Sequence, residues 1–172
     1  MNPRIYLITG VMAAGKSSVA QGLAERLPRS VHVRGDSFRR AIVNGREELG
    51  AELSLEGEAQ LALRYRVAAT AARLYFEAGF AVVYQDIILG ESLAEVAGYF
   101  DGLPLSVVVL CPDPVAVAGR EAARGKTGYR NADEIAFFDH VLRAKTPRLG
   151  VWLDTTELTV DETVERILAA AG

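Results

Sequence analysis

The residues with the clearest chemical meaning form the segment Gly10 to Ser17, which reads GVMAAGKS. This segment matches the pattern G-x-x-x-x-G-K-[ST], and it lies between an apolar run and an amphipathic stretch. In that setting the loop N–H groups and the start of the following helix form a site for phosphate groups. We expect Lys16 to reach the β- and γ-phosphates of ATP and the Ser17 hydroxyl to hold Mg²⁺. The residues expected to contact the nucleotide in this loop are Gly10, Val11, Met12, Ala13, Ala14, Gly15, Lys16, Ser17 and Ser18.

Two acidic residues, Asp36 and Asp86, come just after later apolar runs. In a doubly wound sheet the carboxyl ends of the strands share one edge with the phosphate-binding loop. Asp36 is therefore placed to accept the proton of a substrate hydroxyl during phosphoryl transfer, and its alternative role is to cap a helix. Asp86 is a candidate for binding the substrate or for holding a water on Mg²⁺, with a capping or turn role as its alternative. Arg39 and Arg40 are candidates for binding a polar or acidic group of the substrate, or form a solvated pair.

A basic stretch, GREAARGKTGYR, lies between residues 119 and 130. Arg120 and Arg124 are four residues apart and share one helix face, and glycines follow them. We predict that residues from about 120 to 131 form a small lid that closes over ATP and excludes water. Its arginines would neutralise charge on the transferred phosphoryl group. The alternative is a basic helix end that the helix dipole favours.

Short apolar runs alternate with longer amphipathic stretches along the whole chain. This alternation predicts an α/β fold with a five-stranded, doubly wound parallel sheet and helices on both faces. Together with the GVMAAGKS segment, it predicts a fold of the P-loop NTPase or kinase type. The expected strands are residues 5–8, 30–34, 80–84, 105–110 and 151–153. The expected helices follow residue 16, follow Asp36, span 58–78, 91–100, 113–124 and 132–145, and follow residue 160.

The composition limits the classes of protein that need be considered. At 172 residues we predict one domain, residues 1–172. One cysteine excludes an intramolecular disulfide framework. The net charge of −3 argues against a nucleic-acid binder that works by bulk charge. No stretch reaches the roughly 20 apolar residues of a membrane span, so we expect a cytoplasmic protein without a membrane partner.

Four short stretches together resemble the P-loop small-molecule kinases, and within them the chloramphenicol phosphotransferase-like proteins. They are GVMAAGKS, the GDS after the second strand, REAARG, and the LDTT after the fifth strand. The resemblance implies that Asp36 activates a hydroxyl and that Arg120 and Arg124 are lid arginines. It also implies that the segment from Asp154 to Thr156, and so Thr155, borders the adenine. That segment is equally well read as an N-cap region of the last helix.

The sequence thus predicts an ATP-dependent phosphotransferase that moves the γ-phosphoryl group to a hydroxyl of a small molecule, with ATP and Mg²⁺ bound. One alternative is a nucleoside or nucleotide kinase with the nucleobase near Arg39 and Arg40. Another is an ATP-binding regulator without enzymatic activity. A polynucleotide 5′-end kinase is least favoured, because the chain is acidic. The identity of the acceptor and the oligomeric state stay open.

Overall fold

The computed structural model describes residues 3–48, 50–123, 129 and 131–171. Its centre is one sheet in which every pair of neighbouring strands is parallel, in the order β2-β3-β1-β4-β5. The strands are β1 (Ile5–Gly10), β2 (Ser30–Arg34), β3 (Ala81–Gln85), β4 (Leu105–Leu110) and β5 (Val151–Leu153). The predicted doubly wound α/β fold is confirmed.

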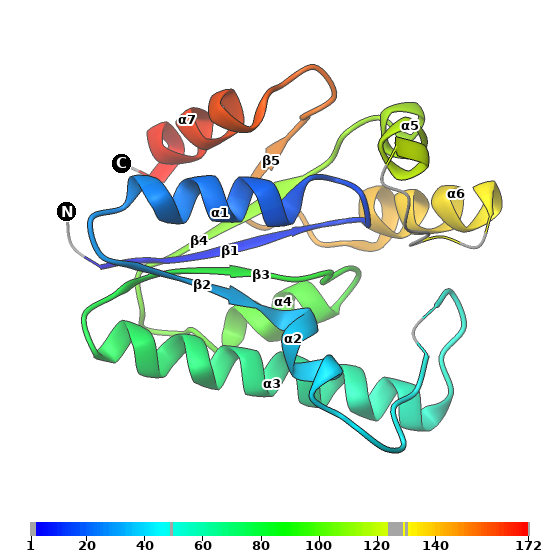
Figure 1. Cartoon of the computed structure of the whole chain (residues 1–172), viewed down its shortest axis with the longest axis horizontal. Coiled ribbons are helices and arrows are strands. Elements are labelled where there is room, and N and C mark those ends of the chain that lie inside the picture. Colours follow the sequence, from blue (N-terminus) through cyan, green and yellow to red (C-terminus); the bar gives the residue numbers. More distant parts are fainter. Residues whose placement is uncertain (1–2, 49, 124–128, 130, 172) are drawn as a thin grey trace.

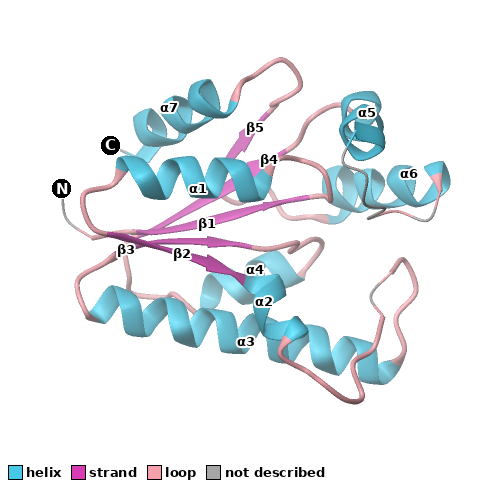
Figure 2. Cartoon of the chain, in the orientation of Figure 1, coloured by secondary structure: helices cyan, strands magenta, loops and turns pink. Residues whose placement is uncertain are grey.

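Helices cover both faces of this sheet. Figure 1 shows α1 and α7 on one face and α3 and α4 on the other, while α5 and α6 stand beyond the carboxyl ends of the central strands. The same layers are clear in Figure 2, where the strands run between two groups of helices. The helices are α1 (Lys16–Arg26), α2 (Gly35–Arg40), α3 (Leu55–Glu77), α4 (Ser92–Gly98), α5 (Pro114–Ala123), α6 (Ala132–His140), the π-helical turn η1 (Val141–Lys145) and α7 (Val160–Ala171).

The sheet forms because its strands are apolar along almost their whole length. All six residues of β1 are buried, as expected for a strand with helices on both sides. Small side chains on α3, such as Ala68 and Ala72, are fully buried and let that helix approach the sheet closely. Among the described residues, no helix is long and apolar enough to cross a membrane.

The strand register sets which residues lie together at the carboxyl ends of the strands. Arg34 of β2 pairs with Gln85 of β3, and Ile8 of β1 pairs with the same Gln85. The residues that follow these partners, among them Asp36 and Asp86, therefore lie at one edge together with the loop after β1. This is the edge that the sequence predicts for the chemistry.

Two of the differences between the predicted and the observed helix boundaries have a clear structural cause. The α3 helix begins at Leu55 rather than residue 58, because the Ser54 hydroxyl caps it by accepting a hydrogen bond from the Gly57 N–H at 3.0 Å. The expected helix 132–145 changes at Val141 into a π-helical turn. There the Thr146 hydroxyl donates to the Val141 carbonyl at 3.0 Å and accepts from the Gly90 N–H at 2.8 Å.

Candidate active site

The phosphate-binding loop, residues 10–17, owes its path to two glycines with positive φ, Gly10 at 151° and Gly15 at 93°. A Cβ on Gly10 would lie 2.5 Å from the carbonyl oxygen of Leu110 in β4, so that only glycine lets the loop leave the sheet here. Beside Gly15 the space for a Cβ is open. The loop thus packs tightly against the sheet at its start and is open where the helix begins.

The start of α1 is suited to bind an anion. Gly15 is its N-cap and offers no capping side chain, and the first turn holds no acidic residue. The first N–H groups of a helix have no partner within that helix, and the helix dipole adds partial positive charge. Lys16 is 8% exposed and its Nζ donates to the Val11 carbonyl at 2.6 Å, which holds the ammonium group over the loop. With the exposed Ser17 hydroxyl beside it, this arrangement fits a nucleotide phosphate chain and its Mg²⁺.

Asp36 and Asp86 meet at one arginine, Arg64 of α3. Arg64 Nε donates to Asp86 Oδ2 at 2.9 Å, and its Nη2 contacts Asp86 Oδ1. Arg64 Nη1 lies 3.6 Å from Asp36 Oδ1. The side chain of Asp86 is fully buried, whereas that of Asp36 is 40% exposed and also accepts a hydrogen bond from Arg40 Nε. The two acids that the sequence singles out are therefore neighbours with different surroundings.

Burial sets the electrostatics of this group. It raises the pKa of Asp86 above its ordinary value, and the Arg64 guanidinium and the Ile87 N–H, at 2.8 Å from Oδ1, oppose that rise. Burial lowers the pKa of Arg64, but the nearby Asp86 carboxylate raises it, and the net shift is upward. Burial, followed by the charge of Asp86, raises the pKa of the neighbouring Tyr84 hydroxyl as well.

The helix α2 can hold Asp36 above this pair because its first residue is Gly35. A Cβ on Gly35 would collide with the Asp86 carboxylate. The glycine thus lets the helix start directly on the buried acid. Asp36, the next residue, consequently stands at the boundary between the buried pair and solvent.

The two arginines after Asp36 differ in their partners. Arg39 is 17% exposed, and its Nη2 donates to the Glu47 carbonyl at 2.8 Å and lies 3.3 Å from Glu48 Oε2. Arg39 therefore ties α2 to the segment between residues 41 and 54. Arg40 is 73% exposed and turns back to Asp36.

Arg120 of α5 contacts the segment that follows β5. Its Nη2 donates to the carbonyl of Thr155 at 2.7 Å and lies 3.2 Å from that of Thr156. Asp154 shapes this segment by accepting hydrogen bonds from the N–H and hydroxyl of Thr156, at 2.9 and 2.6 Å. Two stretches predicted to border the nucleotide, the start of the lid and the LDTT segment, are thus brought together. Arg124 and residues 125–128 and 130 of the predicted lid lie outside the described residues.

Comparison with known proteins identifies the family. A model described as an AAA domain matches residues 5–147, most of the chain. The chain belongs to this AAA-domain family. None of the curated proteins matches it in sequence.

The solved structures with a similar fold include a resistance protein and two kinases. A tunicamycin resistance protein of Deinococcus radiodurans is 18% identical with a TM-score of 0.78, over 99% of this chain and 96% of the other. A sugar kinase of Janibacter sp. is 20% identical with a TM-score of 0.71, over 97% and 93%. A gluconokinase of Sinorhizobium meliloti is 20% identical with a TM-score of 0.69, over 98% and 91%. This AAA-domain chain thus has the fold of the P-loop kinases.

Sequence reasoning singled out neither Arg64 nor Tyr129, although Tyr129 lies within the predicted lid. Tyr129 is 6% exposed, and its hydroxyl donates to the carbonyl of Met12 in the phosphate-binding loop at 2.8 Å. A signal for Arg64 was present: it is a charged residue inside the stripe of α3 that also buries Tyr65 and Ala68. Charged side chains are rarely buried without a partner, so this position called for one. For Tyr129 the sequence indicates the segment but not the contact of its hydroxyl.

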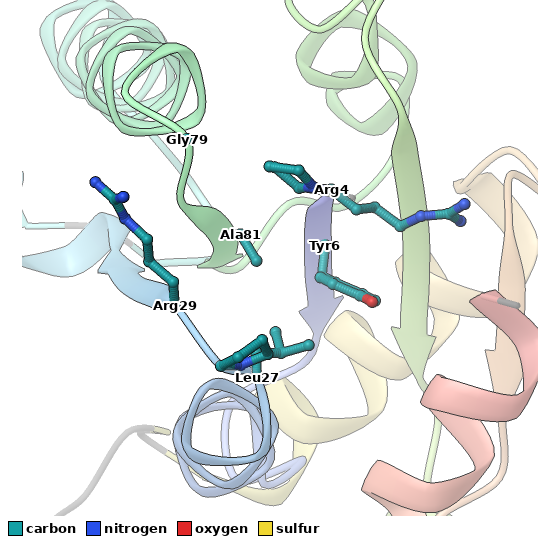
Figure 3. Close-up of a pocket in the computed structure, with 8 residues that line it drawn as sticks. Arg4, Tyr6, Leu27, Arg29, Gly79 and Ala81 are labelled. Carbon is teal, nitrogen blue, oxygen red and sulfur yellow. The ribbon is translucent and has the colours of Figure 1, made fainter. Parts of the chain in front are cut away.

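A cavity at the opposite end of the strands is separate from the candidate active site. It holds about 60 Å³ and lies by the amino-terminal ends of the strands, between Tyr6, Leu27 and Ala81. Its two arginines point away from it (Figure 3). Arg4 donates to the Ser106 hydroxyl at 2.9 Å, and Arg29 lies over the Phe80 ring at 4.2 Å. We assign no ligand to this cavity.

Proposed function

We propose that the protein is an ATP-dependent kinase that transfers the γ-phosphoryl group of ATP to a hydroxyl of a small molecule. The observation that carries this proposal is the partly exposed Asp36 carboxylate, which is paired with Arg40 and lies near Arg64 at the sheet edge that also bears the phosphate-binding loop. The kinases among the structures of similar fold support it. Use of ATP also fits the expected cytoplasmic location.

In the proposed reaction the Lys16 ammonium and the loop N–H groups bind the phosphate chain. Mg²⁺, when bound, neutralises charge on the phosphates, and the Ser17 hydroxyl is the group placed to hold it. Asp36 accepts the proton of the acceptor hydroxyl as the acceptor oxygen bonds to the γ-phosphorus. The bond from the γ-phosphorus to the bridging oxygen breaks, and its electrons leave with ADP. Positioning and charge neutralisation supply most of the rate in such transfers.

The remaining site residues take supporting roles in this proposal. Arg120, Asp154 and Thr155 border the adenine, and Arg124 acts as the second lid arginine. Arg39 and Arg40 shape the acceptor side of α2. Both carboxylate oxygens of Asp86 already have partners. Direct contact of Asp86 with the substrate or with a Mg²⁺-bound water would therefore require its pair with Arg64 to open.

The test is phosphoryl transfer by the variant Asp36→Asn, measured across a panel of small hydroxyl compounds and nucleosides. We expect transfer to fall by about 10²- to 10⁴-fold, the usual contribution of a general base. ATP affinity should stay within about twofold, because the phosphate-binding loop is unchanged. Asp101→Asn, a substitution at an exposed turn residue, is the matched control and should retain full activity.

The outcome of this test also separates the alternatives. ATP binding without transfer to any acceptor by the parent protein would favour the regulator. Transfer only to nucleosides or nucleotides would favour the second kinase class. Near-parental transfer by Asp36→Asn would remove Asp36 from the role of base.

A further inference from the structure

Arg64 is a buried cation that the proposed reaction leaves without a chemical role. Its side chain is 7% exposed and sits on the sheet-facing side of α3, between the carboxylates of Asp86 and Asp36. A charge is kept in such a place only when it is paired, and losing one partner is costly. The contacts of Arg64 therefore bear on which acceptor molecules can bind beside Asp36.

The pair with Asp86 occupies only part of the guanidinium. Arg64 Nε and Nη2 are directed at the two oxygens of Asp86. Arg64 Nη1 lies 3.6 Å from Asp36 Oδ1, which is beyond hydrogen-bond distance. Because the guanidinium is planar and its donors are fixed, Nη1 cannot turn away while the pair with Asp86 holds. A hydrogen-bond donor and the carboxylate of Asp36 are thus held side by side.

In the part of the chain that the structure describes, three arginines at or near Asp36 each have an acidic partner. Arg64 is paired with Asp86, Arg40 with Asp36 itself, and Arg39 with Glu48. An acceptor that brings a negative charge here would face the carboxylate of Asp36. To bind Arg64 by two hydrogen bonds it would have to displace Asp86, which would leave a fully buried carboxylate uncompensated.

We propose that Arg64 is a specificity-determining residue that selects a neutral acceptor with two neighbouring hydroxyl groups. This inference rests on the proposed function. One hydroxyl donates its proton to Asp36 and becomes the nucleophile. The neighbouring hydroxyl accepts a hydrogen bond from Arg64 Nη1, which fixes the acceptor relative to the base. Sugars and polyols without a carboxylate or phosphate have this chemistry.

The first experiment uses the parent protein and matched acceptors. Aldoses and alditols are compared with the corresponding aldonates and sugar phosphates, with ADP formation and the phosphorylated product both measured. We expect kcat/KM to be at least about tenfold higher for the neutral member of each pair, because the Asp36 carboxylate repels the negative charge that the other member brings to the site. A preference for the anionic members would overturn the inference while leaving the proposed kinase activity intact. Transfer to neither class, with ATP binding retained, would overturn both.

The second experiment uses a double variant in which neither member of the buried Arg64–Asp86 pair is charged. The double variant Arg64→Gln with Asp86→Asn removes both charges together and so avoids a lone buried ion. Gln is too short to replace Nη1, and we expect KM for the neutral acceptor to rise by about 10- to 100-fold with KM for ATP unchanged. Arg66→Gln, on the exposed face of the same helix, is the matched control and should behave as the parent.

Asp86→Asn alone provides the opposite signature. It leaves Arg64 charged without its buried partner, so the ratio of anionic to neutral kcat/KM should rise above that of the parent. A merely structural role of the pair would lower activity on both classes and leave that ratio unchanged. An unchanged KM for the neutral acceptor in the double variant would likewise refute the role of Arg64, and circular dichroism would confirm that each variant is folded.

Discussion

Asp36 and Asp86 are the same residue type and follow neighbouring strands, yet their surroundings differ. Asp86 is fully buried and paired with Arg64, so it fixes the position of a cation. Asp36 is 40% exposed and keeps access to solvent, as its proposed role of base requires. The distinction depends on one residue without a side chain, Gly35, because any Cβ there would occupy the place of the Asp86 carboxylate.

Replacing Gly35 by alanine tests this close approach. The new methyl group would push α2 away from Asp86, and overpacking of this kind typically costs about 1–3 kcal/mol of unfolding free energy. We expect urea unfolding at a lower midpoint and loss of transfer activity, because Asp36 moves with α2. Gly119→Ala is the control: a Cβ there meets nothing within 4 Å, and alanine in a helix should stabilise the protein by about 0.5–1 kcal/mol. Equal stability of the two variants would contradict this account.

Among the elements, the edge strand β2 is only partly buried, and it carries a titratable group. His32 Nδ1 lies 2.9 Å from Gln21 Oε1 of α1, and its Nε2 is buried with no hydrogen-bond partner in the described structure. Burial, and then the positive charge of Arg34, lowers the pKa of His32 to about 4. At neutral pH the strand therefore packs against α1 with a neutral imidazole.

This predicts a loss of stability in mild acid. The unfolded chain binds a proton at His32 below about pH 6.5, whereas the folded chain does so only near pH 4, so the free energy of unfolding falls as the pH drops between these values. Urea unfolding at pH 7.5 and pH 5 should show a smaller difference for His32→Gln than for the parent. His140→Gln, at an exposed helix end, is the control and should keep the parental difference. The same pH dependence in His32→Gln and the parent would show that another group causes it.

At the scale of the whole molecule, the sequence suffices for the sheet, its direction and the phosphate-binding loop. Those features depend on local patterns: the buried runs of β1 and β4, and the glycine spacing before Lys16. The contacts that complete the site are not local. Arg64 and Asp86 are 22 residues apart, and Tyr129 reaches Met12 across 117 residues. No periodicity records such pairs, although a charge inside a buried helical stripe indicates that one exists.

The stability of the whole chain should respond to the nucleotide, because a ligand that binds only the folded state stabilises it by mass action. At about 100 times its Kd, ATP with Mg²⁺ should add about 2.7 kcal/mol. For a chain of this size that is a rise in Tm of roughly 5–10 °C in calorimetry.

Lys16→Ala should abolish most of this shift, and so should chelation of Mg²⁺ by EDTA with the parent protein. The reason is that the ammonium over the loop and the metal each neutralise phosphate charge. Lys145→Ala, at an exposed lysine of η1, removes the same charge far from the loop in sequence and should leave the shift unchanged. If Lys16→Ala and Lys145→Ala gave equal shifts, the loop would not be the nucleotide site, and the placement of Asp36 beside it would lose its meaning for catalysis.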